Sequence, residues 1–241
     1  MTIRKYIPNT ITCLSLACGC VAAVLALRGN LEGALWAVVL SACFDFMDGL
    51  AARTLHAYSP IGKELDSLAD EVAFGLAPGM MLFRLIEEMK PGLTPHALGS
   101  LLPYLAFFIP VFSALRLAKF NIDARQSTSF LGLPVPAHAL LWASLVCTLQ
   151  PLVASYGSWP FALALVVLAF LSSLLLVSEC PMFSFKVKSI AWKGNELRYI
   201  TLAAAVFFIA LGGLSGIAAT ILLYLLLSLL FYKRKKEEKK C

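Results

Sequence analysis

Long apolar runs dominate the sequence, and short segments rich in Gly, Pro and charged residues separate them. A helix that crosses a bilayer needs about 20 mostly apolar residues. This criterion predicts eight membrane-spanning helices, at residues 8–27, 32–54, 65–86, 97–118, 135–154, 160–178, 198–212 and 215–232. The last two runs are short, and the Gly-rich break at 212–216 is typical of either a tight turn or a kink. Seven spans, with one long final helix, therefore remain the alternative.

The composition agrees with this pattern. Apolar side chains make up 60% of the 241 residues and charged side chains 14%, with a mean hydropathy of +0.82. A soluble domain has roughly 45–50% apolar and about 25% charged residues. A soluble globular protein, a disordered chain and a coiled coil are therefore excluded. We predict a single all-α domain over residues 1–241, a polytopic membrane helical bundle with no soluble part.

Basic residues are distributed unevenly between the predicted loops. The net charge is +6, but the excess flanks apolar runs and forms a basic tail at 233–241, so nucleic acid is not an expected partner. Lys and Arg in short loops are retained in the cytoplasm. With eight spans, 17 of the 20 Lys and Arg lie on the side of both termini, and only Arg28, Arg84 and Lys90 lie on the other. We predict a multi-pass protein of the cell membrane with both termini in the cytoplasm.

Four aspartates lie at the cytoplasmic ends of two consecutive predicted spans: Asp45, Asp48, Asp66 and Asp70. Carboxylates are costly in membrane segments, so they indicate a functional site. The spacing of three in the first pair and four in the second places each pair on one face of its helix. A hairpin that turns near Gly62 would bring the two faces together. The sequence therefore predicts one pocket with four carboxylates.

Four carboxylates in one pocket repel one another, and bound divalent cations are the simplest way to offset this repulsion. Oxygen ligands favour magnesium, manganese or calcium over zinc, and magnesium commonly completes its coordination with substrate phosphates. Gly49 and Ala52 leave room for such a ligand, while the guanidinium of Arg53 suits a phosphate oxygen. The alternative is structural, with the aspartates forming ion pairs at the helix ends with Arg53 and Lys63.

The pattern D-x2-D-G-x2-A-R-x8-G-x3-D-x3-D is matched at every position from Asp45 to Asp70. It resembles the signature of the CDP-alcohol phosphatidyltransferase family, integral membrane enzymes that displace CMP from a CDP-linked substrate with an alcohol. The resemblance implies that the four aspartates bind two divalent cations, magnesium or manganese first and calcium as a further candidate, and that Asp70 is the general base. It implies nucleotide or CDP-lipid contacts for Asn9, Thr12, Gly49, Ala52, Arg53, Ser59 and Gly62.

Further segments resemble the phosphatidylserine synthase branch of that family, at residues 69–78, 116–121, 130–137 and 181–186. This branch implies CDP-diacylglycerol and L-serine as substrates and phosphatidylserine and CMP as products. The chain departs from many relatives at 71–73, where a serine commonly precedes the Phe-Gly pair. Other acceptors, namely glycerol phosphate, inositol phosphate or choline, remain the alternative, and a cation transporter is a remote one because its acidic residues should reach the bilayer midplane on several spans.

A serine acceptor also needs a partner for its carboxylate, and the loop after the fourth predicted span offers Arg116, Lys119 and Asn121. The alternative for these basic residues is anchoring to anionic membrane lipid. The small-xxx-small spacings at 75–79 and 212–216 permit close helix contact, so a homodimer is expected, although such spacings often occur by chance. The active site is expected to face the cytoplasm.

Overall fold

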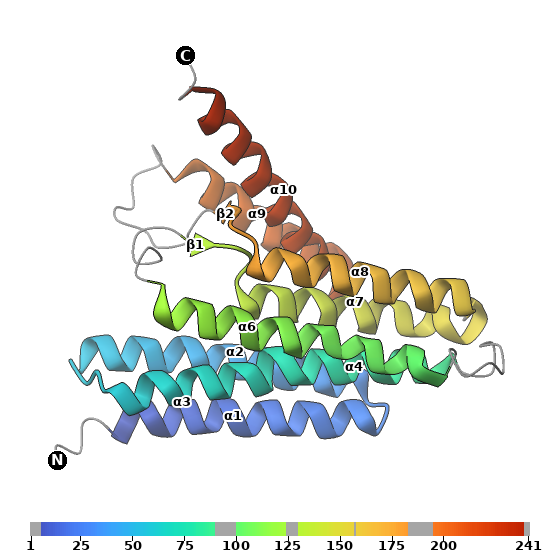
Figure 1. The fold of residues 1–241 in the computed structure, drawn as a ribbon, viewed down its shortest axis with the longest axis horizontal. Helices are drawn as coiled ribbons and strands as arrows, with labels where there is room; N and C mark the ends of the chain where they lie inside the picture. The colour runs from blue at the N-terminus through green and yellow to red at the C-terminus, as the bar shows by residue number, and fades with distance from the viewer. Residues whose placement is uncertain (1–5, 90–99, 124–129, 157, 183–194, 239–241) are drawn as a thin grey trace.

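Helices make up nearly all of the described structure; most of them run along one common direction, and the last two lie obliquely to it (Figure 1). It is a computed structural model that describes residues 6–89, 100–123, 130–156, 158–182 and 195–238. The elements are α1 (Tyr6–Leu27), α2 (Leu31–Thr54), α3 (Pro60–Asp70), the π-helix η2 (Glu71–Leu76), α4 (Ala77–Glu88), the 3-10 helix η4 (Leu102–Phe107), α6 (Phe108–Ile122), β1 (Phe130–Leu131), α7 (Val135–Tyr156), α8 (Trp159–Val177), β2 (Pro181–Met182), α9 (Glu196–Gly212) and α10 (Leu214–Glu238).

The helices follow the predicted spans closely. Five of them are long and apolar enough to cross a membrane: Tyr6–Leu27, Leu31–Thr54, Leu102–Ile122, Val135–Val153 and Trp159–Val177. The third predicted span lies within the continuous helix formed by α3, η2 and α4. The last two coincide with the shorter apolar helices Arg198–Gly212 and Leu214–Ser228. The prediction of a polytopic helical membrane protein is confirmed.

The break at 212–216 is a turn between two helices. α9 ends at Gly212 and α10 begins at Leu214. Gly213 between them has φ +55° and ψ −125°, a conformation open to glycine but strained for a residue with a side chain. The two helices then pack against each other, as two separate helices do and one kinked helix does not.

A short pairing of two strands is the one departure from purely helical structure in the described part of the chain. Phe130 pairs with Met182 and Leu131 with Pro181, in antiparallel register. The pairing joins the segments that precede α7 and follow α8. Two residues on each side are too few to show in an apolar pattern, so the sequence gives no strand signal here.

Helix α1 supports the helices that carry the aspartates, since it packs against α2, α3, η2 and α4. Its contact with η2 is very close, because a Cβ atom on Gly19 would lie 2.7 Å from the Cα atom of Ala73. Its contact with α2 is polar at one point. The hydroxyls of Ser15 and Ser41 lie 2.7 Å apart, and each also lies within 3.1 Å of the other residue's carbonyl oxygen.

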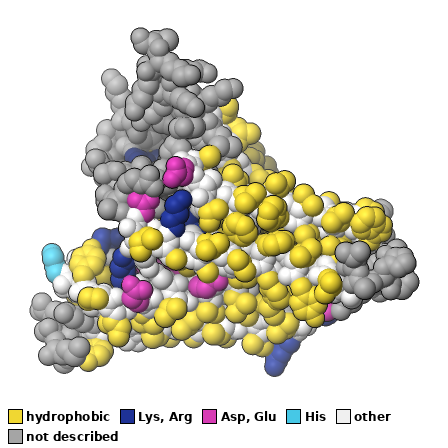
Figure 2. Space-filling view, in the orientation of Figure 1, with side chains coloured by type: hydrophobic (Ala, Val, Ile, Leu, Met, Phe, Trp, Pro, Cys, Tyr) yellow, Lys and Arg dark blue, Asp and Glu magenta, His cyan; other side chains and the backbone are white. Residues whose placement is uncertain are grey.

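Charged side chains gather at one end of the bundle on the face shown in Figure 2, whereas apolar side chains cover its middle and other end. The start of α1 and the last residues of α2, α6 and α8 lie toward the same end (Figure 1). This arrangement is the one expected of helices that cross a membrane in alternating directions. Several of the counted basic residues, at 4–5, 90, 125 and 186–193, lie outside the described residues.

The glycines of the two small-xxx-small spacings make helix contacts within one chain. A Cβ atom on Gly79 would lie 2.8 Å from Pro110 of α6, and one on Gly216 would overlap the backbone of Phe208 in α9. Both glycines therefore permit close packing between helices of one chain. The expected homodimer remains a prediction that these glycines do not support.

Candidate metal and nucleotide site

Three of the four aspartates meet between α2 and α3. Asp45 and Asp48 lie near the end of α2, and Asp66 lies in α3 after the turn at residues 55–59. Their carboxylates each offer an oxygen within 4.8 Å of the other two. Asp70 lies about one helical turn further along α3, outside this group of three, and interacts electrostatically with all three carboxylates. The predicted hairpin therefore brings three carboxylates into one cluster, with the fourth beside it.

Asp48 is held by a hydroxyl from α1. Thr12 Oγ1 donates a hydrogen bond to Asp48 Oδ2 at 2.6 Å, and the carbonyl oxygen of Pro8 lies 3.1 Å from the same hydroxyl. Both side chains are buried, with Thr12 3% and Asp48 6% exposed. A short hydrogen bond to an ionised group is among the stronger ones in proteins. It fixes the direction in which Asp48 presents its second oxygen.

A cavity of about 230 Å³ opens beside the cluster. Asp48 and Asp66 line it together with residues of α1, α2, the 55–59 turn and α3. All seven residues expected to contact the nucleotide or CDP-lipid are among its lining: Asn9, Thr12, Gly49, Ala52, Arg53, Ser59 and Gly62. The carboxylates and the expected nucleotide contacts therefore belong to one continuous site.

The two glycines of the motif have different surroundings. A Cβ atom on Gly62 would lie 2.9 Å from Asn9 Oδ1 and 3.0 Å from Ser59 Oγ, the oxygen that accepts the Gly62 N–H and caps α3. Gly62 thus permits α1 to approach the start of α3. A Cβ atom on Gly49 would meet only Arg53 Nη1, at 3.8 Å. Gly49 therefore leaves open space on the cavity side of α2.

Four further residues line the cavity beyond those expected: Pro8, Ala57, Tyr58 and Lys63. Pro8 directly precedes Asn9 in α1. Lys63 Nζ donates to the carbonyl oxygen of Asn121 at 2.9 Å, so it joins α3 to the end of α6. The sequence gives no sign that Tyr58 lines the cavity. An aromatic residue in a turn contacts a cavity only when the turn packs against it, and a sequence pattern does not record that packing.

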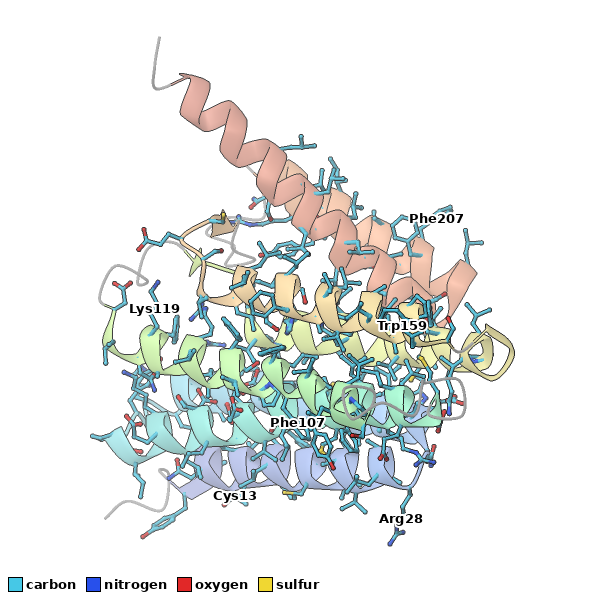
Figure 3. The ribbon with its side chains drawn as sticks, turned by 45° about the vertical axis from the view of Figure 1, so that its right-hand side comes forward. Cys13, Arg28, Phe107, Lys119, Trp159 and Phe207 are labelled. Atoms are coloured by element: carbon cyan, nitrogen blue, oxygen red, sulfur yellow. The ribbon has the colours of Figure 1, made fainter. Side chains whose placement is uncertain are left out.

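The three expected serine contacts on α6 separate in the structure. Lys119, labelled in Figure 3, donates to the carbonyl oxygen of Val177 at 3.3 Å. Asn121 Nδ2 donates to Ser67 Oγ at 2.8 Å. Both bonds tie α6 to neighbouring helices. Arg116 is buried, 4% exposed, with its guanidinium carbon 5.0 Å from the centroid of the Phe120 ring.

The cluster has the chemistry of a divalent-cation site. Its donors are all oxygens, three carboxylates within 4.8 Å and the Thr12 hydroxyl behind one of them, a set that suits magnesium, manganese or calcium. In the described structure no ion pair joins these aspartates to Arg53 or Lys63, whereas Arg84 pairs with Glu87 and Glu88. The purely structural interpretation, with aspartates paired at helix ends, therefore finds no support.

Comparison with known proteins agrees with this geometry. The sequence profile described as CDP-alcohol phosphatidyltransferase matches residues 5–211. The chain is similar to the CDP-diacylglycerol--serine O-phosphatidyltransferase of Bacillus subtilis (strain 168), with 34% identity over 154 residues that cover 64% of this chain and 82% of that protein. The proteins of the same name from Mycobacterium leprae (strain TN) and Helicobacter pylori (strain J99) are 32% and 35% identical over 185 and 136 residues, 74% and 56% of this chain. The chain spans 58% and 54% of those two proteins. Since the profile covers most of the sequence and every residue of the cavity, the chain belongs to the CDP-alcohol phosphatidyltransferase family.

Proposed function

We propose that this protein transfers the phosphatidyl group of CDP-diacylglycerol to the hydroxyl of L-serine and releases CMP. One observation supports the proposal most directly. Two carboxylates of the cluster line the same cavity as all seven residues that were expected to contact the nucleotide. The names of the relatives supply the acceptor, since each is called a CDP-diacylglycerol--serine O-phosphatidyltransferase.

Asp45, Asp48 and Asp66, with Asp70 beside them, would hold two divalent cations, magnesium or manganese. Cations bound there would offset the charge of the substrate diphosphate and stabilise the leaving phosphate. Thr12 orients Asp48 toward this task, and Arg53 and Lys63 add positive charge to the cavity wall. Gly49 leaves space for the diphosphate to approach α2.

Asp70 is the proposed general base. The serine hydroxyl oxygen attacks the phosphorus that carries the diacylglycerol, and its proton passes to the Asp70 carboxylate. The bond between that phosphorus and the bridging oxygen breaks, and CMP leaves with the oxygen. The position of Asp70, one turn further along α3 than Asp66, separates the base from the three clustered carboxylates.

An apolar groove next to the cluster supports a lipid substrate. Phe46, which directly follows Asp45 in α2, lines a groove of about 430 Å³. Its lining is entirely apolar and comes from four helices: Val39, Ala42, Cys43 and Phe46 of α2, Leu140 of α7, Ile209 of α9 and Ile217 of α10. A lipid whose diphosphate lies at the carboxylates needs an apolar surface for its acyl chains, and this groove provides one.

Arg116 is the proposed partner of the serine carboxylate, because its guanidinium is buried and Lys119 and Asn121 have other partners. The cavity is proposed to face the cytoplasm, on the side where 17 of the 20 Lys and Arg lie. A homodimer is also proposed.

The test supplies purified protein in lipid nanodiscs with CDP-diacylglycerol and one acceptor at a time: serine, glycerol phosphate, inositol phosphate or choline. Mass spectrometry identifies the lipid product. We expect phosphatidylserine from serine and no product above background from the others. A lipid formed from another acceptor, with none from serine, would reject the proposed acceptor while keeping the transferase chemistry.

A further inference from the structure

One set of buried polar side chains lies outside the carboxylate cavity, in the core where α6, α7 and α8 approach one another. We call it the core polar group. Its members are at most 8% exposed: Ser113 and Arg116 of α6, His138 of α7, and Ser172 and Ser173 of α8. Polar side chains inside a membrane protein are costly and commonly mark a binding site or a polar pathway. The transferase site described above uses only Arg116 from this set.

Two contacts fix how α6 lies along α8. The rings of Phe112 and Phe170 are 6.0 Å apart, and Lys119 donates to the carbonyl oxygen of Val177. The polar members of both helices fall between these contacts: Ser113 and Arg116 on α6, Ser172 and Ser173 on α8. His138 reaches the same level from α7 through its bond to Ser172. The five side chains therefore share one layer of the core.

The hydrogen bonds of Ser172 fit one tautomer of the neutral His138 ring. Ser172 Oγ donates its single proton to the carbonyl oxygen of Ala169 at 3.0 Å and accepts from Trp142 Nε1 at 2.9 Å. His138 Nε2 lies 3.0 Å from the same hydroxyl oxygen. With the Ser172 proton donated to Ala169, His138 donates through Nε2–H. Its Nδ1 then carries a lone pair and can only accept.

Four atoms of the core polar group have no hydrogen-bond partner in the described structure: Ser113 Oγ, Arg116 Nε, His138 Nδ1 and Ser173 Oγ. Buried polar atoms are nearly always paired, so unpaired ones need an explanation. Here they differ in kind. Arg116 is a cationic donor without an acceptor, His138 Nδ1 is a neutral acceptor without a donor, and the two hydroxyls can act in either way.

The core polar group and the proposed general base Asp70 lie at similar positions along the helix axes. α6 runs along the helix that carries Asp70, with Asn121 bonded to Ser67 at 2.8 Å near one end. Near the other end, a Cβ atom on Gly79 would lie 2.8 Å from Pro110. The general base on one helix and the buried guanidinium on the other both fall between these two contacts. A small acceptor bound at the guanidinium would therefore lie along the same stretch of this helix pair as the base.

We propose that the core polar group is the amino-acid subsite, and that His138 Nδ1 accepts a hydrogen bond from the ammonium group of the acceptor. The inference rests on the proposed function and deepens it. Arg116 binds the carboxylate of the zwitterion, and the hydroxyls of Ser113 and Ser173 complete the contacts to its polar groups. A neutral imidazole acceptor and hydroxyls can bind an ammonium group without adding a charge to the buried site.

Two amide substitutions at His138 separate ligand binding from a structural role. The amide of His138→Asn stands near the position of Nδ1 and keeps an acceptor there, but it loses the contact with Ser172. The amide of His138→Gln stands near Nε2 and keeps the Ser172 contact, but it removes the acceptor at Nδ1. We expect His138→Gln to raise the KM for serine roughly 10-fold or more, because a hydrogen bond to a charged group is lost. His138→Asn should raise this KM clearly less than His138→Gln does, because it keeps the acceptor at the position of Nδ1.

Inhibition by 3-hydroxypropionate, which is serine without its ammonium group, provides the ligand control. Its inhibition constant against serine should be the same for wild type and His138→Gln. The KM for CDP-diacylglycerol should not change in either variant. The opposite order, with His138→Asn impaired and His138→Gln normal, would overturn the inference and assign His138 a structural role. An equal loss for serine and 3-hydroxypropionate would also overturn it.

Alanine variants of Ser113 and Ser173 keep the test independent of how the His138 variants fold. Each should raise the KM for serine about threefold or more, the effect of one neutral hydrogen bond. Ser228→Ala is the control, because Ser228 in α10 is another buried serine, 2% exposed, that lies outside the core polar group. A serine KM unchanged in both subsite variants would overturn the inference. Absence of phosphatidylserine from the wild type would instead reject the proposed function itself.

Discussion

Replacement of Thr12 by Val tests whether α1 positions the carboxylate cluster. Valine keeps the β-branched shape of the side chain and removes only the hydroxyl that donates to Asp48 Oδ2 at 2.6 Å. Since Asp48 is 6% exposed, water cannot easily replace this donor. A hydrogen bond to a charged group contributes about 1.5–3 kcal/mol, which corresponds to roughly 10- to 150-fold. We expect a loss of that order in kcat/KM.

The assay measures CMP release while magnesium or manganese is titrated. If Thr12 orients a cation ligand, the variant should need a higher cation concentration for half-maximal activity, and excess cation should restore part of the rate. Thr10→Val is the matched control, because Thr10 Oγ1 is exposed and bonds only the carbonyl oxygen of Tyr6 in its own helix, at 2.8 Å. An unchanged cation requirement in Thr12→Val, or an equal loss in Thr10→Val, would refute the reasoning.

The remaining predictions concern the cluster, the glycine contact and the topology. Asp66→Asn keeps the size of the side chain but removes a charge from the cluster, so activity should fall by orders of magnitude; activity that survives both this change and EDTA would contradict the cation site. Gly62→Ala adds a Cβ atom 2.9 Å from Asn9 Oδ1 and should raise the KM for CDP-diacylglycerol with less change for serine, as measured by steady-state kinetics. A cysteine replacing Tyr58 should react with an impermeant thiol reagent only from the cytoplasm, and one replacing Arg28, at the opposite end of the bundle (Figure 3), only from outside; labelling of both from one side would contradict the topology.

The helices were predictable because membrane insertion depends on the local apolar content of the chain. The predicted range 32–54 lies within Leu31–Thr54, and 198–212 coincides with Arg198–Gly212. The choice between a turn and a kink at 212–216 was open, because glycine permits both. It is decided by the packing of α9 against α10, which an apolar pattern does not contain.

The π-helix of η2 was not predictable from the sequence pattern. It begins at Glu71, directly after Asp70, and π-turns inside helices are frequent at functional sites. Residues of the π-helix make close tertiary contacts, such as that of Ala73 with Gly19, which is more than fifty positions away in the sequence. Local apolar periodicity does not record such a contact.

The candidate site was predictable where one short motif carries it. Residues from Asp45 to Asp70 lie on two adjacent helices and their turn, so their spacing alone indicates that they meet. The acceptor contacts were harder to assign, because Arg116, Lys119 and Asn121 are near neighbours in sequence but face different helices. The bond from Thr12 to Asp48 was also missed, since it depends on how α1 packs against α2.

Transfer of an isotope from the serine hydroxyl tests the central claim most directly. Purified protein freed of cations by chelation and then given manganese is supplied with CDP-diacylglycerol and serine carrying ¹⁸O in its hydroxyl. The account predicts one CMP for each phosphatidylserine, the ¹⁸O retained in phosphatidylserine and absent from CMP, and neither product before manganese is restored. Formation of CMP without phosphatidylserine, ¹⁸O in the CMP, or full turnover in the chelated protein would contradict it.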